Sequence, residues 1–290
     1  MLPCSSKRKA LKGFIFRGQS TEKYDLIPSA LREDNWEKLA IMAKIDDPGE
    51  FSSLSNKIKV EYEALKNFYL LANYSGLQVP IIKEFIVQTY RDDFIKRPEH
   101  WIPDELLELA ALAQHYGIPT RLLDWTFDFN IALYFASLGA CKKIEEKSTV
   151  DPQEKMVVWA LNFDFLKEDA RSIVKFISPS YALNQNVCAQ KGILTHWRVN
   201  ERISYDEFTQ GYKSGLMHFD DLINTYYKDV SCPLLYKITI PVNKAIDVFE
   251  CLNDLGYSAS RLFPGYAGIT REMEEKKFFR GRKRDRILQG

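Results

Sequence analysis

One segment, residues 113–136, constrains this 290-residue chain more than any other part of it. It reads AQHYGIPTRLLDWTFDFNIALYFA, so a helical pattern stops at Gly117 and Pro119, and a nearly all-apolar helical pattern begins about ten residues later. Glycine followed by proline is a common helix end, and a helix that is apolar all round must be buried. We therefore expect the polar stretch 120–126 to be a loop between two helices and the centre of a site.

Helical patterns dominate the first half of the chain and strand patterns the second. Apolar periodicity predicts helices over 56–73 and 80–93, one starting at Asp104, and one over 129–138 capped by Thr126 or Asp128; it predicts strands over 12–16, 156–161, 192–197, 234–240 and 245–249. Strict alternation of strand and helix is absent. The prediction is an α+β fold, with a helix-rich N-terminal half packed on a mixed or antiparallel sheet that begins with the strand carrying Arg17.

Composition excludes several classes of protein. A hydrophobic content of 46% is ample for a core, and a net charge of +1 predicts no partner from global electrostatics. The five cysteines are odd in number and form no CxxC pair, which argues against a disulfide framework and a cysteine-rich zinc site. No apolar run approaches the roughly 20 residues of a membrane span, and no secretory signal is visible. We expect a cytoplasmic protein without a membrane partner.

Arg17 and Gly18 are the first candidate site residues, at the end of the first predicted strand. An arginine there offers a planar fork of donors to a phosphate or carboxylate. The glycine lets a ligand approach the backbone. The alternative is an arginine in a surface ion pair beside a turn glycine.

The polar stretch supplies Thr120, Arg121, Asp124 and Trp125 as further candidates. Two interpretations stay open, and they are compatible. Arg121 and Asp124 are three residues apart and form a buried ion pair that locks the loop while Trp125 fills the core, or the same side chains face a ligand.

His115 precedes this stretch by one turn and is a candidate acid–base or phosphate-binding group. Its alternative role is a helix-end histidine bonded to a carbonyl. The other histidines show no metal-like spacing, so no metal is expected. Glu272 and Glu274 belong to an acidic run that reads as a solvated helix face.

The basic segment Lys276–Arg286 could contact nucleic acid, with Phe278 and Phe279 stacking on bases; a solvated tail is the alternative. The glycine-rich dinucleotide fingerprint, the P-loop and the hydrolase elbow motif are all absent from the sequence.

Several of these motifs together resemble the FRG domain, a family named for its Phe-Arg-Gly motif. The resemblance rests on Phe16-Arg17-Gly18, on residues 24–29 (YDLIPS) with Arg32, and on residues 113–136; residues 190–194 and 262–268 match more weakly. Many members carry a proline just after the Asp-Trp-Thr triplet, where this chain has Phe127. The resemblance spans about residues 12–272 and implies a single domain over 1–275, with a helical insert at about 35–110 and a basic tail over 276–290. Members are mostly bacterial or phage-associated.

A more distant likeness is to arginine-class ADP-ribosyltransferases, whose first strand carries an aromatic-Arg-Gly sequence. It implies an ADP-ribosyltransferase-like fold and NAD as the substrate of a transferase or NAD glycohydrolase, of bacterial toxin or phage-defence type. The implied NAD-binding residues are Arg17 at the pyrophosphate, Thr120 and Arg121 at ribose or phosphate, Tyr134 or Trp125 stacked on a ring, and Gly18, Ser29, Arg32 and Asp124 around them.

The catalytic glutamate of those enzymes does not carry over, because no late strand bears Glu-x-Glu. Glu272, Glu274, Gln190 and His115 are the candidates for that role. The alternative function is a non-catalytic module that binds a nucleotide, a nucleic acid or a protein in the same pocket.

Overall fold

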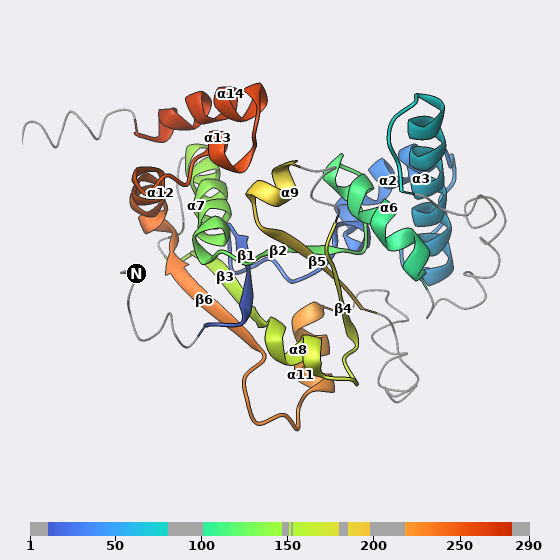
Figure 1. The fold of residues 1–290 in the computed structure, drawn as a ribbon, viewed down its shortest axis with the longest axis horizontal. Coiled ribbons are helices and arrows are strands. Elements are labelled where there is room, and N and C mark those ends of the chain that lie inside the picture. The colour runs from blue at the N-terminus through green and yellow to red at the C-terminus, as the bar shows by residue number, and fades with distance from the viewer. Residues whose placement is uncertain are drawn as a thin grey trace, which may run out of the picture.

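A computed structural model describes residues 11–80, 101–146, 151, 153–179, 185–197 and 218–279 (Figure 1). Most of the helix expected over 80–93, and the basic segment beyond Phe279, lie outside these residues. Within them, no helix combines the length and apolar character needed to cross a membrane.

An open antiparallel sheet of six strands forms the centre of the fold. Its strands are β1 (Phe14–Gln19), β2 (Leu123–Thr126), β3 (Lys155–Asn162), β4 (Val174–Ile177), β5 (Gly192–Trp197) and β6 (Leu235–Pro241), in the order β4-β5-β2-β1-β3-β6. All neighbouring strands pair antiparallel. The predicted α+β class is confirmed, and the strand carrying Arg17 lies in the middle of the sheet.

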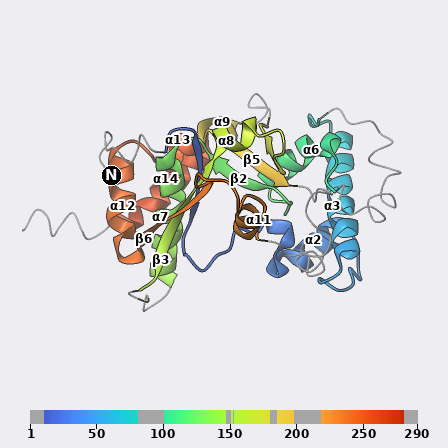
Figure 2. The ribbon, with the colours of Figure 1, turned by 90° about the horizontal axis from the view of Figure 1, so that it is seen from below.

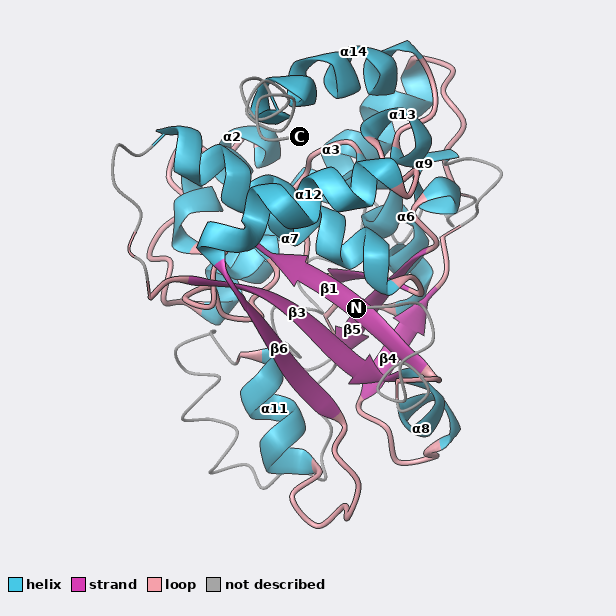
Figure 3. Cartoon of the chain, turned by 90° about the vertical axis from the view of Figure 1, so that its left-hand side faces the viewer, coloured by secondary structure: helices cyan, strands magenta, loops and turns pink. Residues whose placement is uncertain are grey.

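Helices cover both faces of this sheet (Figure 3). On one face lie α7 (Phe129–Glu146), α12 (Ala245–Asp254), α13 (Ala259–Leu262) and α14 (Tyr266–Glu275), and on the other lie α8 (Phe163–Glu168) and α11 (Phe219–Tyr226). Side chains of a strand alternate between faces. Phe16 therefore joins the core under α7, whereas its neighbour Ile15 joins the core of the opposite face.

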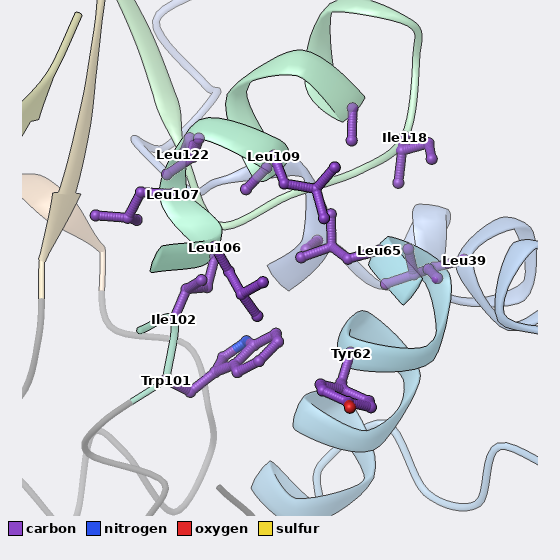
Figure 4. Close-up of a cluster of buried hydrophobic side chains, with 14 of the residues drawn as sticks. Leu39, Tyr62, Leu65, Trp101, Ile102, Leu106, Leu107, Leu109, Ile118 and Leu122 are labelled. Atoms are coloured by element: carbon purple, nitrogen blue, oxygen red, sulfur yellow. The ribbon is translucent and has the colours of Figure 1, made fainter. Parts of the chain in front are cut away.

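A separate helical unit adjoins the β4–β5 end of the sheet (Figures 1 and 2). It consists of α2 (Trp36–Ala43), α3 (Leu54–Tyr74) and α6 (Asp104–His115), preceded by the short 3-10 turns Ser29–Leu31 and Glu33–Asn35. Its core brings Tyr62 of α3 next to Trp101, with ring centroids 6.1 Å apart (Figure 4). Ile177 of β4 and Leu194 of β5 belong to the same apolar cluster, which joins the helical unit to the sheet.

Four of the predicted strands are confirmed as β1, β3, β5 and β6, and the helices expected at 56–73, from Asp104 and at 129–138 are confirmed as α3, α6 and a longer α7. Asp128 caps α7, because its carboxylate accepts from the Asn130 amide at 3.0 Å. The strand predicted over 245–249 is wrong. Those residues begin α12, whose buried residues Ala245, Phe249 and Leu252 follow helical spacing.

The expectation of a plain loop over 120–126 is also wrong, since Leu123–Thr126 is strand β2. All four residues pair with β5, from Leu123 opposite Thr195 to Thr126 opposite Gly192. Leu123 and Trp125 point into the core while Asp124 stays exposed. Tertiary pairing, rather than local propensity, makes this segment extended.

Candidate functional site

A small pocket opens where β1 and β2 separate. These two strands pair only at Phe16 and Thr126. The pocket has a cavity volume of about 90 Å³ and is lined by residues of β1, β2, β5, α7 and α9 (Gln185–Ala189). Its polar lining consists of Arg17, Asp124, Thr126 and Gln190, and the remaining lining residues are apolar or glycine.

Arg17 spans the gap between the two strands and holds Asp124 at two points. Its Nη1 donates to the Asp124 backbone carbonyl at 2.9 Å and lies 2.6 Å from Oδ1 of the same residue. The arginine side chain is 13% exposed, whereas the aspartate side chain is 69% exposed. A fixed guanidinium is therefore paired with a carboxylate that is open to solvent.

Electrostatics keep this aspartate ionised. Desolvation by the surrounding protein would by itself raise the pKa of Asp124. The charge and hydrogen bond of Arg17, together with the charge of Arg32, outweigh it and hold the pKa below its ordinary value. Burial and the neighbouring charge of Arg17 lower the pKa of Arg32, which nonetheless remains a cation at neutral pH. The charges of two guanidinium groups thus act on one pocket carboxylate, and Arg17 is the one that contacts it.

Gln190 closes the far side of the pocket and ties it to α13. Its side-chain Nε2 donates to the Leu262 carbonyl at 3.1 Å, and its backbone carbonyl accepts from the Thr126 hydroxyl at 2.7 Å. Sequence reasoning proposed this residue as a catalytic candidate, and the structure places it in the pocket lining.

Gly18 also lines the pocket, but its lack of a side chain is explained by α7. A Cβ at this position would lie 1.8 Å from the carbonyl oxygen of Ala132. The glycine allows β1 and α7 to approach at backbone distance.

The expected ion pair between Arg121 and Asp124 does not form. Arg121 is buried, and its Nε lies 2.8 Å from Oε2 and 2.9 Å from Oε1 of Glu61 on α3. Asp124 pairs with Arg17 instead. Arg121 precedes β2 and lies against α3, whereas Asp124 is in β2 beside β1, so the two side chains find partners in different elements.

Four further candidates, Ser29, Thr120, Trp125 and Arg32, make hydrogen bonds within the fold. The Ser29 hydroxyl accepts from the Thr120 amide at 3.0 Å and donates to the Thr120 carbonyl at 3.3 Å. The Thr120 hydroxyl bonds Gln114. Trp125 is buried, and its Nε1 donates to the Thr195 hydroxyl at 2.9 Å. Arg32 likewise donates from Nε and Nη2 to the Ile27 carbonyl, at 3.0 and 2.9 Å.

Tyr134 does not line the pocket. It is fully buried under α12, and its hydroxyl donates to Oε2 of Glu275 at 2.7 Å. Arg271 donates to the other oxygen of Glu275 at 2.9 Å. The structure therefore places this tyrosine in a buried polar link between α7 and α14.

The two glutamates proposed for catalysis lie on α14 and do not line the pocket. Glu272 accepts from the Ser260 amide at 3.2 Å, and hydrogen bonds from Ser258 and Ser260 lower its pKa. Glu274 is exposed. His115 is half-buried at the end of α6, where its ring meets Tyr116 edge-on at 5.0 Å, and burial lowers its pKa.

Sequence reasoning missed Glu61, which accepts from Trp101 Nε1 at 2.7 Å as well as from Arg121. The only signal was a glutamate on the apolar face of a predicted helix, beside Tyr62 and Leu65. No group of histidine, cysteine, aspartate and glutamate within the described ranges could hold a metal ion.

The FRG domain model matches residues 12–145, from just before β1 to the end of α7. The match includes Arg17, Asp124 and the segment between them. The chain therefore carries an FRG domain. The FRG domain supplies β1, β2 and α7 of the pocket wall, while α9 and β5 come from the following part of the chain. No curated protein and no solved structure gave a significant match.

Proposed function

We propose that the pocket of this FRG-domain protein binds the phosphate groups of a nucleotide, with NAD as the first candidate. The observation that carries the proposal is the fixed guanidinium of Arg17 in the pocket lining, paired with the single described pocket carboxylate, Asp124, at 2.6 Å. The charge of Arg32, which lies outside the lining, acts on the same carboxylate. Arginine forks are suited to phosphate recognition. A cavity of about 90 Å³ suits a part of a nucleotide rather than the whole molecule.

The chemistry that we propose for bound NAD is loss of nicotinamide, as in ADP-ribosyl transfer or NAD hydrolysis, in a bacterial toxin or phage-defence role. Such a reaction passes through a cation-like sugar, which a nearby carboxylate stabilises. Asp124 is the carboxylate among the described pocket residues, and it is held ionised. This supports Asp124, rather than Glu272 or Glu274, as the carboxylate that stabilises the sugar cation.

Calorimetry with NAD, together with an assay of nicotinamide release, tests this function. The wild-type protein should bind NAD, and Arg17→Ala should weaken binding at least tenfold. Lys38→Ala, on the exposed side of α2, is the matched control for loss of one positive charge. Absence of NAD binding, or binding that Arg17→Ala leaves intact, would reject the proposal.

A second candidate is a non-catalytic module that recognises its ligand through the same pocket. It is favoured by the lack of any glutamate among the described pocket residues. In that case NAD or another nucleotide binds without nicotinamide release, and Asp124→Asn and the Glu272→Gln/Glu274→Gln double variant leave the product assay at background. Nicotinamide release that depends on Asp124 would exclude it.

A further inference from the structure

The donors of Arg17 are unequally available to a ligand. A guanidinium carries five N–H groups, one on Nε and two on each Nη. Nη1 donates to the Asp124 backbone carbonyl and also lies 2.6 Å from Oδ1 of the Asp124 carboxylate, so Asp124 contacts this nitrogen twice. Nε is buried and has no hydrogen-bond partner among the described residues.

This arrangement decides how the arginine can hold an oxyanion. The strongest mode is a pair of parallel N–H bonds to two oxygens. The fork formed by Nε and Nη2 is closed, because Nε has no access from solvent. The fork that remains is Nη1 with Nη2, and the Asp124 carboxylate competes with a ligand at Nη1.

The Asp124 carboxylate can turn away from Arg17 at modest cost in free energy, whereas the Arg17 guanidinium stays in place. The aspartate side chain is 69% exposed, so its carboxylate can turn into water without losing much buried contact. The guanidinium would keep the bond from Nη1 to the Asp124 backbone carbonyl, at 2.9 Å. Release of the carboxylate therefore opens Nη1 to a ligand without loosening the arginine.

We propose that the Asp124 carboxylate acts as an internal anion. It pairs with Arg17 until the phosphate of a ligand takes its place. The inference rests on the proposed function and deepens it. The site selects oxyanions that can accept from Nη1 and Nη2 of Arg17 at once, such as phosphate and pyrophosphate, over anions that make a single contact. Competition from the Asp124 carboxylate lowers the affinity of the site for such a ligand.

Binding of inorganic pyrophosphate, measured by calorimetry, tests the exchange. Asp124→Asn should bind pyrophosphate about tenfold more tightly than the wild type, because a neutral amide competes less well than a carboxylate for a charged donor, and tenfold corresponds to about 1.4 kcal/mol. Asp34→Asn is the matched control, since Asp34 is exposed and also acts on Arg32. It should change the affinity less than twofold.

A double-variant cycle separates the exchange from a general change in charge. Lysine has no fork, so Asp124→Asn should give little gain in an Arg17→Lys background. Asp124→Ser serves as the second variant if Asp124→Asn does not fold. Equal or weaker pyrophosphate binding by the Asp124 variants, or an equal gain in the Arg17→Lys background, overturns the exchange. The proposed function fails separately, if the wild type and Asp124→Asn both fail to bind NAD.

Discussion

Arg121 and Glu61 form a buried ion pair between the segment before β2 and the middle of α3, with Nε 2.8 Å from Oε2. The same carboxylate accepts from Trp101, so one residue of the helical unit holds two other segments. The pair fixes the approach to β2, and through it the position of Asp124 in the pocket.

Replacement of this carboxylate should destabilise the protein strongly. Glu61→Gln leaves the buried charge of Arg121 uncompensated, and breaking a buried pair in this way costs about 3–5 kcal/mol. Urea unfolding gives the change in the free energy of unfolding. Glu108→Gln, on the exposed side of α6, is the control and should change it by less than about 0.5 kcal/mol. Equal effects of the two variants would show that the pair adds no stability.

Lys57, one turn before Glu61 on α3, makes stability depend on pH. Burial, together with the charge of Arg121, lowers the pKa of Lys57 to about 8. Between pH 8 and the unfolded pKa of about 10.4, the unfolded chain binds a proton that the folded chain has lost, so stability rises with pH. As pH falls from about 10.4 to 8 this gain is lost, and below pH 8 both states bind the proton, so the dependence ends.

The comparison that isolates Lys57 is with Lys57→Met. From pH 8 to pH 10 the wild type should gain about 2 kcal/mol in the free energy of unfolding relative to Lys57→Met, at up to about 1.4 kcal/mol per pH unit. Lys38→Met, at an exposed position of α2, should show no such divergence. Parallel pH profiles for the wild type and Lys57→Met would mean that this lysine stays charged in the folded protein.

The strands that could be predicted from sequence are those whose signal is local and strong. The run MVVWAL of β3 is apolar at every position, which is typical of a strand buried on both faces. The helix ending before Gly117 was predictable because Gly117 has a φ of +88°, a conformation that favours glycine.

The contacts that form the pocket could not be predicted, because a single sequence does not show which distant residues pair. Strand β2 has four residues, one of them a charged aspartate, and becomes extended by pairing with β5 about 70 residues later. The partners of Arg121 and Asp124 lie 60 and 107 residues away. Spacing within the segment favoured a local pair, while the fold offered each side chain a distant partner.

The wrong prediction of a strand over 245–249, where α12 begins, also came from judging the pattern locally. The sequence AIDVF contains two β-branched residues, which are favoured in strands. Its helical character shows only when Leu252 is included, because the buried face then repeats after four and three residues. A five-residue window was too short to distinguish the two periods.

Gly18→Ala should disrupt the contact between β1 and α7. The new methyl group would meet the carbonyl oxygen of Ala132 at 1.8 Å, and the backbone at both sides must separate. We expect a loss of at least about 3 kcal/mol, the upper range for overpacked cores, measured by urea or thermal unfolding. Gly76→Ala is the comparison, since its φ of +70° costs about 1–2 kcal/mol but its surroundings are open. A smaller loss at Gly18 than at Gly76 would contradict the close approach.

Tyr134→Phe distinguishes a structural role for this tyrosine from ring stacking on a ligand. Removal of the hydroxyl leaves one oxygen of the buried Glu275 carboxylate without its donor at 2.7 Å, which should lower the free energy of unfolding by about 1.5–3 kcal/mol. NAD affinity should stay within twofold of the wild type, because Tyr134 does not line the pocket and phenylalanine keeps the ring.

Tyr266→Phe provides the control on α14, where the ring is 89% exposed and loss of its hydroxyl should leave stability unchanged. Tyr134→Leu completes the test, since it removes the ring as well as the hydroxyl. If Tyr134→Leu, measured at a temperature where it remains folded, binds NAD like the wild type, the tyrosine acts only through Glu275. A selective loss of NAD affinity in Tyr134→Leu would instead place the ring at the ligand and require α7 to turn toward the pocket when ligand binds.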